Sequence, residues 1–286
     1  MEYTKGVIGM KIAILSGKGG AGKTFTAVNL ASVMERAVYV DCDVEEPNGR
    51  LFLKPDDVKT HEVYTLLPNF DASKCTGCKK CVDFCKFNAL VYVKDKPIVF
   101  KEICHSCGGC ELVCPEGAVS EEKRPVGIVE VGTHNNVKSV TGVLNFGEAS
   151  GVPAINEAIK TGDSIGDTVI LDCPPGSACS VMESVEGADY CILVAEPTAF
   201  GFHNFKMVYE LVTLLGKPLG VVINKEDEAY KSLEDFCKSN NIPILMHIPY
   251  DKEIASLSGE GHIYAEESDK GKELFTSLLS RIGGAC

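Results

Sequence analysis

The sequence predicts an α/β protein in which a doubly wound, mainly parallel sheet is interrupted by an inserted α+β module. Short apolar runs rich in Val and Ile alternate with segments of helical apolar spacing, which is typical of parallel strands covered by helices on both faces. A glycine-rich stretch directly follows the first apolar run. More than a hundred residues separate the second run from the third, too many for a single crossover, and a cysteine-rich repeat lies among them.

The strands of the main domain are expected in order along the chain. The first, at residues 11–16, runs into the glycine-rich stretch and then into a helix with the sequence TAVNLASVMERA. Residues 126–145 alternate and contain turn residues, which indicates a hairpin. Ligands of such sheets bind at the carboxyl ends of the strands. The other expected strands are Ala37–Asp43, Thr168–Gly176, Tyr190–Pro197, Pro218–Asn224 and Ile242–Tyr250.

The composition limits the class of partner and the compartment. The formal net charge of -12 argues against a surface that holds nucleic acid or anionic lipid, because phosphate binding needs clustered Lys and Arg. No apolar run approaches the roughly 20 residues of a membrane span, and residues 1–15 lack a basic region and a cleavage site. We therefore expect a cytoplasmic protein that binds neither nucleic acid nor membrane. Residues 1–9 are expected to be a short leader, with Met10 as an alternative start.

The stretch SGKGGAGKTF, residues 16–25, fits two nucleotide-binding fingerprints. Its glycines spell the G-x-G-x-x-G of a dinucleotide fold, and Asp41 lies about 20 residues on, where an acid bonds a ribose hydroxyl. The P-loop pattern G-x4-G-K-T also explains Lys23, which reaches the β and γ phosphates, and Thr24, whose hydroxyl binds magnesium. It requires a second acid at a strand end to organise the magnesium shell, and Asp172 fits. We therefore predict ATP and Mg2+ as ligands. The nucleotide-binding residues predicted in the loop are Gly17, Gly19, Gly20, Ala21, Gly22, Lys23, Thr24 and Phe25.

The segment from Lys18 to Thr24 spells K-G-G-x-G-K-[ST], the deviant Walker A signature. The chain thereby resembles the MinD/ParA family of P-loop ATPases, whose relatives include the nitrogenase iron protein and the Mrp-type iron–sulfur carriers. In that family the first lysine of the signature contacts nucleotide phosphate across a dimer interface. The resemblance therefore implies a homodimer with Lys18 acting in trans, and it covers the chain outside residues 70–119.

The resemblance also implies roles for residues outside the loop. Asp43 in DCDVEEPN matches the first switch of the family, where an aspartate orients or activates the attacking water. The segment Asp172–Gly176 matches the second switch, whose movement reports loss of the γ-phosphate. Asn224 and the segment Pro249-Tyr250-Asp251 match positions that contact adenine. The predicted catalytic residues are Lys18, Lys23, Asp43 and Asp172.

Eight cysteines form an internal repeat. Residues 74–90 and 103–119 align without gaps, and each carries C-x2-C-x2-C-x3-C. This is the pattern of bacterial two-cluster ferredoxins, in which three close thiolates bind one 4Fe-4S cluster and the fourth ligand comes from the other motif. We place a ferredoxin domain at residues 70–119 inside a P-loop ATPase domain of residues 1–69 and 120–286. One cluster is predicted to use Cys75, Cys78, Cys81 and Cys114, and the other Cys104, Cys107, Cys110 and Cys85.

Zinc is the alternative ligand of these thiolates, but zinc sites usually pair two separated C-x2-C units. His105 lies between ligands and is expected at the surface, and Cys85 is followed by Lys86 where the second motif has a proline. A role for Cys286, as a free thiol or as a ligand shared across a dimer, stays open. So does a nucleotide-linked role for the cysteines beside the switch aspartates. The cysteines expected to be small buried residues are Cys42, Cys173, Cys179, Cys191 and Cys237.

The C-terminal segment KELFTSLLSRIGGAC places its apolar residues on one helical stripe. Docking on the core is expected rather than membrane binding, because the segment has few basic residues and follows an acidic stretch. The residues of the stripe are Leu274, Phe275, Leu278, Leu279 and Ile282.

The phosphate-binding loop and the cysteine repeat together predict an enzyme in which ATP binding and hydrolysis gate electron delivery from the ferredoxin domain to a partner metalloenzyme. A second hypothesis is an assembly factor that loads clusters or a metal into a client metalloenzyme. The eight-cysteine pattern speaks against it, and no C-x-x-C stands late in the chain, where the Mrp-type carriers hold a bridging cluster. A third hypothesis is a positioning ATPase whose clusters sense redox state.

Overall fold

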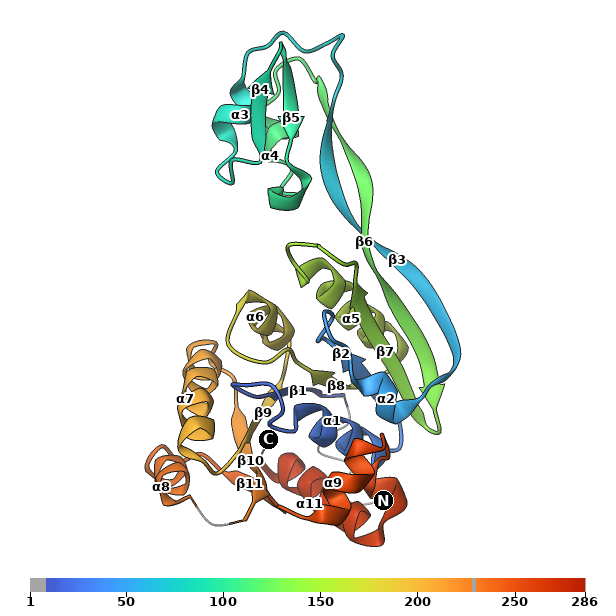
Figure 1. The fold of residues 1–286 in the computed structure, drawn as a ribbon, viewed down its shortest axis with the longest axis vertical. Coiled ribbons are helices and arrows are strands. Elements are labelled where there is room, and N and C mark those ends of the chain that lie inside the picture. The colour runs from blue at the N-terminus through green and yellow to red at the C-terminus, as the bar shows by residue number, and fades with distance from the viewer. Residues whose placement is uncertain (1–8, 228–229, 286) are drawn as a thin grey trace.

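A computed structural model of the chain describes residues 9–227 and 230–285. Its body is a nine-stranded sheet in the order β11-β10-β9-β1-β8-β2-β7-β6-β3 (Figure 1). The strands from β11 to β7 run parallel, and β6 and β3 extend the sheet in antiparallel pairs. These strands are β1 (Lys11–Leu15), β2 (Ala37–Asp41), β3 (Asp56–Phe70), β6 (Val119–His134), β7 (Val137–Leu144), β8 (Thr168–Asp172), β9 (Tyr190–Ala195), β10 (Leu219–Glu226) and β11 (Ile244–Pro249).

Helices cover both faces of the sheet, and each face has its own apolar core. On one face, α5, α6, α7 and α8 bury side chains such as Ile155 and Phe205 against the strands. On the other face, α1, α9 and α11 bury Phe25, Ile254 and Phe275. Burial on both sides explains the continuous apolar strands, and the predicted doubly wound, mainly parallel sheet is confirmed. The helices are α1 (Lys23–Ser32), α2 (Gly49–Leu53), α3 (Lys80–Phe84), α4 (Gly109–Leu112), α5 (Val152–Ile165), α6 (Cys179–Glu186), α7 (Ala199–Leu214), α8 (Lys231–Ser239), α9 (Lys252–Gly259), α10 (Tyr264–Glu267) and α11 (Asp269–Ala285).

The predicted strands of the body are all present, and most of them end earlier than expected. Strand β8 ends at Asp172, four residues before the predicted end, because Pro174 and Pro175 have no N–H group to continue the ladder. The predicted hairpin is present as β6 and β7. The turn between them contains Asn135, whose φ of 50° lies in the left-handed region that Asn tolerates.

A long two-stranded ribbon made of β3 and β6 leaves the body, and the sequence did not predict it (Figure 1). The strands pair from Asp56 opposite Thr133 to Phe70 opposite Val119. The first half of β3 is exposed, so it lacks the one-sided apolar alternation by which a strand is recognised in a sequence.

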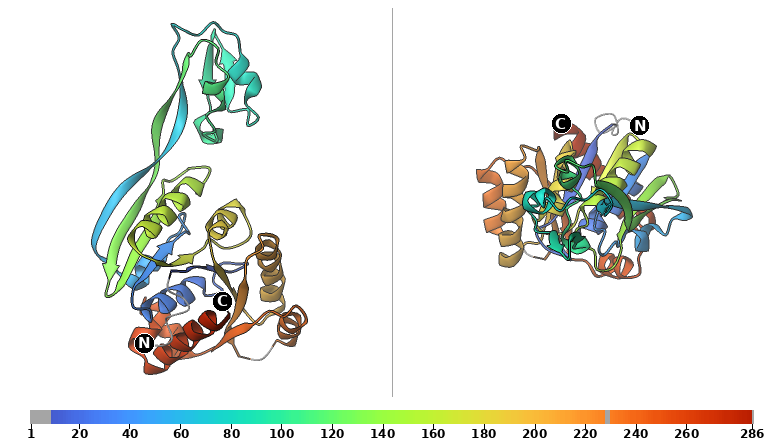
Figure 2. Two further views of the ribbon diagram at one scale, coloured as in Figure 1. Left: turned by 180° about the vertical axis from the view of Figure 1, so that it is seen from behind. Right: turned by 90° about the horizontal axis from the view of Figure 1, so that it is seen from above.

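The chain between β3 and β6 forms a small unit at the far end of this ribbon. It has its own two-stranded sheet, β4 (Leu90–Val93) and β5 (Lys96–Val99), together with the short helices α3 and α4. Seen along the long axis of the molecule, the unit lies over the body (Figure 2). Partway along the ribbon, Arg124 of β6 donates two hydrogen bonds of 2.6 Å to Glu148 in the loop after β7. This pair ties the ribbon to the body.

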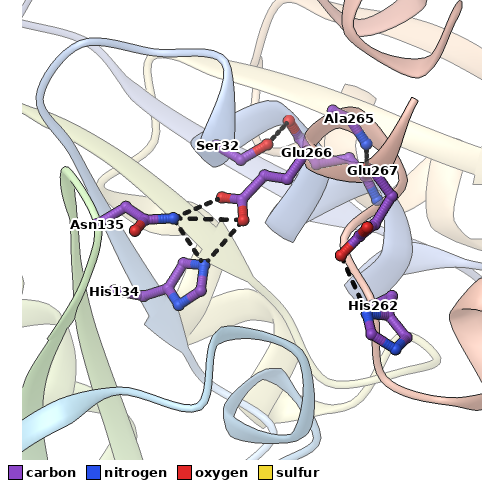
Figure 3. A network of polar contacts seen from close by, with 8 residues as sticks. Ser32, His134, Asn135, His262, Ala265, Glu266 and Glu267 are labelled. Carbon is purple, nitrogen blue, oxygen red and sulfur yellow. Dashed lines mark hydrogen bonds and ion pairs between the residues drawn. The ribbon is translucent and has the colours of Figure 1, made fainter. Parts of the chain in front are cut away.

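The C-terminal segment docks on the core, as predicted. The stripe on α11 is buried apart from a partly buried Leu274. Just before it, the Ala265 N–H donates to Asn29 Oδ1 of α1 at 2.7 Å, and Glu266 Oε2 lies 3.1 Å from His134 Nε2 at the β6–β7 turn (Figure 3). These contacts fix α10 between α1 and the hairpin. In the described part of the chain, no helix has the length and apolar character needed to cross a membrane.

Candidate functional site

The glycine-rich loop lies between the end of β1 and the start of α1, at the carboxyl edge of the parallel strands (Figure 1). Two of its glycines have neighbours that leave no room for a side chain unless those neighbours move. Gly22 has φ 101°, and a Cβ there would lie 2.0 Å from Asn224 Nδ2. A Cβ on Gly17 would lie 2.1 Å from the backbone oxygen of Asn204. The bare backbone of the loop can therefore approach a phosphate at the start of a helix.

Two side chains of β10 hold this loop by donating hydrogen bonds to the carbonyl groups of the loop. Asn224 Nδ2 donates to the Ala21 carbonyl at 2.8 Å, and Lys225 Nζ donates to the Gly20 carbonyl at 2.6 Å. Because these contacts use only acceptors, the N–H groups of the loop stay available to an anion. Lys23 follows on the first turn of α1 and is 7% exposed.

Two aspartates lie side by side at the ends of neighbouring strands. Asp41 of β2 is in register with Asp172 of β8, and both are buried. Asp41 accepts hydrogen bonds from the backbone N–H groups of Asp43 at 3.1 Å and Gly49 at 2.9 Å. It therefore shapes the loop after β2 from inside the protein, which favours the P-loop interpretation over a dinucleotide fold with Asp41 on a ribose.

The two carboxylate oxygens of Asp172 differ in their hydrogen bonding. Tyr39 Oη donates to Asp172 Oδ2 at 2.8 Å, whereas Oδ1 is buried without a hydrogen-bond partner in the described ranges. Burial raises the pKa of Asp172, and the charge of Lys23 and the hydroxyl of Thr24 oppose that rise. A buried carboxylate oxygen beside a threonine hydroxyl is a donor set that suits a hydrated magnesium ion.

Asp43 stands at the edge of the same site. Its partial burial raises the pKa of the carboxyl to about 6, although the charge of Lys23 acts in the opposite direction. A carboxylate that is mostly ionised at neutral pH can orient a water molecule and take up a proton from it.

The other signature lysine makes contacts within its own chain. Lys18 forms an ion pair with Glu196, which stands just after β9, and its ammonium lies 5.5 Å from the centre of the Phe200 ring. Glu196 also pairs with Lys225 at 2.8 Å. Burial acts to raise the pKa of Glu196, but the two lysines hold it below its ordinary value. Neither Glu196 nor Lys225 belongs to a motif that would predict a part in this site from the sequence.

A cavity of about 450 Å3 opens in front of the loop. It brings together most of the predicted residues, from the loop, the first switch, β10 and the start of α9. Residues outside the sequence motifs also line it, among them Phe52 of α2 and Ile254 of α9. Gly17, Lys18, Ala21 and Asp172 are not part of its lining. The predicted residues in the lining are Gly19, Gly20, Gly22, Lys23, Thr24, Phe25, Asp43, Asn224, Pro249, Tyr250 and Asp251.

The eight repeat cysteines lie around two small pockets of the distal unit. The fourth cysteine of each repeat joins the first three of the other, in the sets that the spacing predicts. His105 stacks on Phe87 with ring centroids 3.8 Å apart. Within the described residues, no group of three or more Cys, His, Asp or Glu side chains is placed to hold a single metal ion. Cys75, Cys78, Cys81 and Cys114 line one pocket, and Cys85, Cys104, Cys107 and Cys110 line the other.

The remaining cysteines are mostly buried, as expected for small core residues. Cys42, Cys173, Cys191 and Cys237 are buried beneath α5 to α8. The expectation was wrong for Cys179, the first residue of α6, which is exposed because the buried face of that helix is formed by Val181, Ser184 and Val185. Cys286 lies outside the described residues.

A glycine loop at a strand–helix junction, a buried lysine on the first helical turn and acids at adjacent strand ends define a P-loop nucleotide-binding protein. Residues 12–263 match the family model of the CobQ/CobB/MinD/ParA nucleotide binding domain. The chain belongs to this family.

Several individual proteins resemble the chain. An uncharacterized protein of Methanocaldococcus jannaschii is 30% identical over 294 aligned residues, which span 99% of each chain. An uncharacterized ATP-binding protein of that organism is 28% identical and covers 93% of this chain and 95% of its own. The cell division ATPase MinD of Pyrococcus furiosus has a TM-score of 0.61 at 21% identity and covers 98% of this chain and 100% of its own, a likeness of fold. A shorter match, to an uncharacterized ferredoxin of M. jannaschii, is 42% identical over 55 residues and covers 18% of this chain and 89% of the ferredoxin.

Proposed function

We propose that the protein binds and hydrolyses MgATP and couples this nucleotide switch to electron transfer through two 4Fe-4S clusters toward a partner metalloenzyme. The observation that carries the proposal is the arrangement of the repeat cysteines. Two sets of four thiols surround two separate pockets, in a unit that a continuous ribbon joins to the nucleotide site.

The nucleotide half of the proposal is supported by the donor groups of the cavity and by the ATP-binding relative. Lys23 neutralises phosphate charge at the helix start, and Thr24 with Asp172 Oδ1 supplies oxygen atoms of the kind that Mg2+ prefers. Asp43 orients the attacking water. Catalysis of this kind consists of positioning and charge stabilisation, since the protein forms no covalent bond to the phosphate.

The redox half is supported by the match to a ferredoxin and by the surroundings of the thiols. Thiolate sulfur is the ligand that iron–sulfur clusters take, and bound clusters supply one-electron redox chemistry. The protein's part is to hold the thiols and to shield them. Phe70 and Tyr92 wall one pocket, and Phe84 and Phe87 wall the other. We propose residues 70–119 as this ferredoxin domain.

Coupling between the halves follows the chain from the first switch to the ribbon. The Leu144 N–H at the end of β7 donates to the Val44 carbonyl, just after Asp43, at 2.9 Å. The switch continues through α2 directly into β3, and Arg50 of α2 lies 3.5 Å from Glu130 of β6. A shift of the first switch on loss of the γ-phosphate therefore acts on the root of the ribbon.

We also propose that the active form is a cytoplasmic homodimer. In the single chain, Lys18 is held by Glu196 rather than pointing to a partner. Contact in trans with the nucleotide of a second copy requires Lys18 to leave Glu196, so nucleotide-bound dimerisation exchanges one ion pair for another.

The test is an anaerobic redox titration with EPR detection of the purified chain. The titration is run without nucleotide, with MgADP and with a non-hydrolysable MgATP analogue. Iron and acid-labile sulfide analysis first establishes the cluster content. Lys23→Ala is the matched control, because it removes phosphate binding and leaves the distal unit unchanged.

We expect cluster signals whose midpoint potential shifts with nucleotide by about 60 mV or more, which corresponds to about 1.4 kcal/mol for one electron. Lys23→Ala is expected to abolish the shift. Identical potentials in all three states would refute coupling at the clusters, and a reconstituted chain without iron would refute the redox half altogether.

A further inference from the structure

An ion pair between Arg124 and Glu148 joins the ribbon to the loop after β7. The guanidinium of Arg124 donates to both carboxylate oxygens of Glu148, each at 2.6 Å. The two side chains are 26% and 14% exposed, so solvent and salt screen this pair less than they screen a pair at the surface. Paired bonds between arginine and a carboxylate are strong, and they fix the geometry of both groups.

Arg124 also lies near the second thiol pocket. This is the pocket lined by Cys85, Cys104, Cys107 and Cys110. Glu121 of β6 forms part of its wall, and Arg124 stands three residues further along the same strand, a distance of about 10 Å at the usual rise of a strand. The hydrogen bonds to Glu148 raise the pKa of Arg124 above its ordinary value, and a negative charge on Cys104 adds to that rise. The guanidinium is therefore within electrostatic reach of the second thiol pocket.

The loop between β7 and α5, which carries Glu148, contacts the first switch at both of its ends. Where the loop begins, the Leu144 N–H donates to the Val44 carbonyl at 2.9 Å. Where it ends, Gly151 packs so closely on Val44 that a Cβ on the glycine would lie 2.7 Å from Val44 Cγ2. The loop lies on the side of the body that faces the distal unit (Figure 1). Because Val44 directly follows Asp43, a displacement of the first switch displaces this loop as well.

A positive charge near an iron–sulfur cluster stabilises the reduced form, which is the more negative one, and a neighbouring carboxylate cancels that effect. We propose that Arg124 and Glu148 are the positioning residues through which the nucleotide state changes the reduction potential of the second cluster, the one that the second thiol pocket would hold. While the ion pair is intact, Glu148 neutralises Arg124. When the first switch draws the loop away, the uncompensated charge of Arg124 raises the potential. This inference rests on the clusters and the nucleotide switch of the proposed function, and it names the residues that couple them.

The experiment is an anaerobic redox titration, with EPR detection, of the full-length chain and of the variants Arg124→Gln and Glu148→Gln. Each protein is titrated without nucleotide, with MgADP and with a non-hydrolysable MgATP analogue. The signal of the second cluster is the one that Cys107→Ser removes. Arg50→Gln is the matched control, because it breaks an arginine–glutamate pair nearer the root of the same ribbon, between Arg50 and Glu130.

Without nucleotide, Arg124→Gln should lower the potential of the second cluster and Glu148→Gln should raise it. Each should change the reduction equilibrium at least about threefold, where a tenfold change is about 59 mV for one electron. The nucleotide-dependent shift should be lost in both variants. Both substitutions break the same ion pair, so a purely structural role would move the potential in one direction in both. Arg50→Gln should leave the nucleotide-free potential at the wild-type value.

Two results would overturn the inference and leave the proposed function standing. One is a nucleotide-dependent shift that persists in Arg124→Gln and Glu148→Gln. The other is a change of the nucleotide-free potential in the same direction in both variants. A wild-type chain whose clusters do not respond to nucleotide would refute the proposed coupling and this link together, and a chain without iron would refute the redox half of the proposed function as well.

Discussion

The contact between Gly22 and Asn224 allows a prediction whose size follows from the structure. An alanine at residue 22 must adopt a φ near 101°, which costs an L residue about 1–2 kcal/mol. Its Cβ also displaces Asn224 Nδ2 from the Ala21 carbonyl, and losing that buried hydrogen bond costs about 0.5–1.5 kcal/mol. Gly22→Ala should therefore lower the free energy of unfolding by about 2–3 kcal/mol.

The same bond is lost in Asn224→Ala, so the two substitutions should not add. Asn224→Ala alone should cost about 1 kcal/mol, and almost nothing in a chain that already carries Gly22→Ala. Urea unfolding of the four anaerobically prepared proteins, followed by circular dichroism, measures the cycle. Gly19→Ala is the control within about 0.5 kcal/mol of wild type, because a Cβ there meets nothing within 4 Å. Full additivity of the two changes would refute the contact.

Three further predictions concern the acids and the thiols. ATP turnover should fall as the pH drops through about 6, because protonation of Asp43 removes the carboxylate that orients water. Asp43→Asn should lower turnover at least about tenfold and should abolish this fall at acid pH. An unaltered pH profile in Asp43→Asn would assign the fall to another group. Tyr39→Phe removes the 2.8 Å bond to buried Asp172 and should lower unfolding stability by about 1–2 kcal/mol; thermal unfolding with an unchanged Tm would contradict it. Cys107→Ser should reduce iron from about eight to about four atoms per chain, whereas Cys179→Ser, outside both thiol sets, should leave iron at the wild-type level.

The body of the fold was predictable because its signals are local. Each central strand is buried on both faces, so its sequence is a continuous apolar run. The glycine loop was predictable for a similar reason, since a φ of 101° at Gly22 strains any residue that carries a side chain. The ribbon was not predictable in this way. The exposed half of β3 has no apolar face, and its pairing with β6 joins segments far apart in the chain.

In the candidate site, too, the residues of local motifs were predictable and the residues brought together by the sheet were not. Residues within one motif, such as Lys23 and Thr24, follow from spacing alone. Glu196 follows β9 and Lys225 lies on β10, and only the order of β10, β9 and β1 in the sheet brings both residues to the loop that they contact. The exposure of Cys179 depends on which face of α6 packs on the sheet, and the residue type of Cys179 alone does not determine that.

The ribbon has a consequence for how such a chain can change over evolutionary time. Its two strands end as the directly paired residues Phe70 and Val119, so the whole distal unit begins and ends at adjacent points in space. The sheet of the body needs only that these two strands meet. A different unit with closely spaced ends, or a simple turn, would satisfy the same requirement, so the distal unit can be lost, replaced or exchanged between genes while the nucleotide switch keeps its architecture.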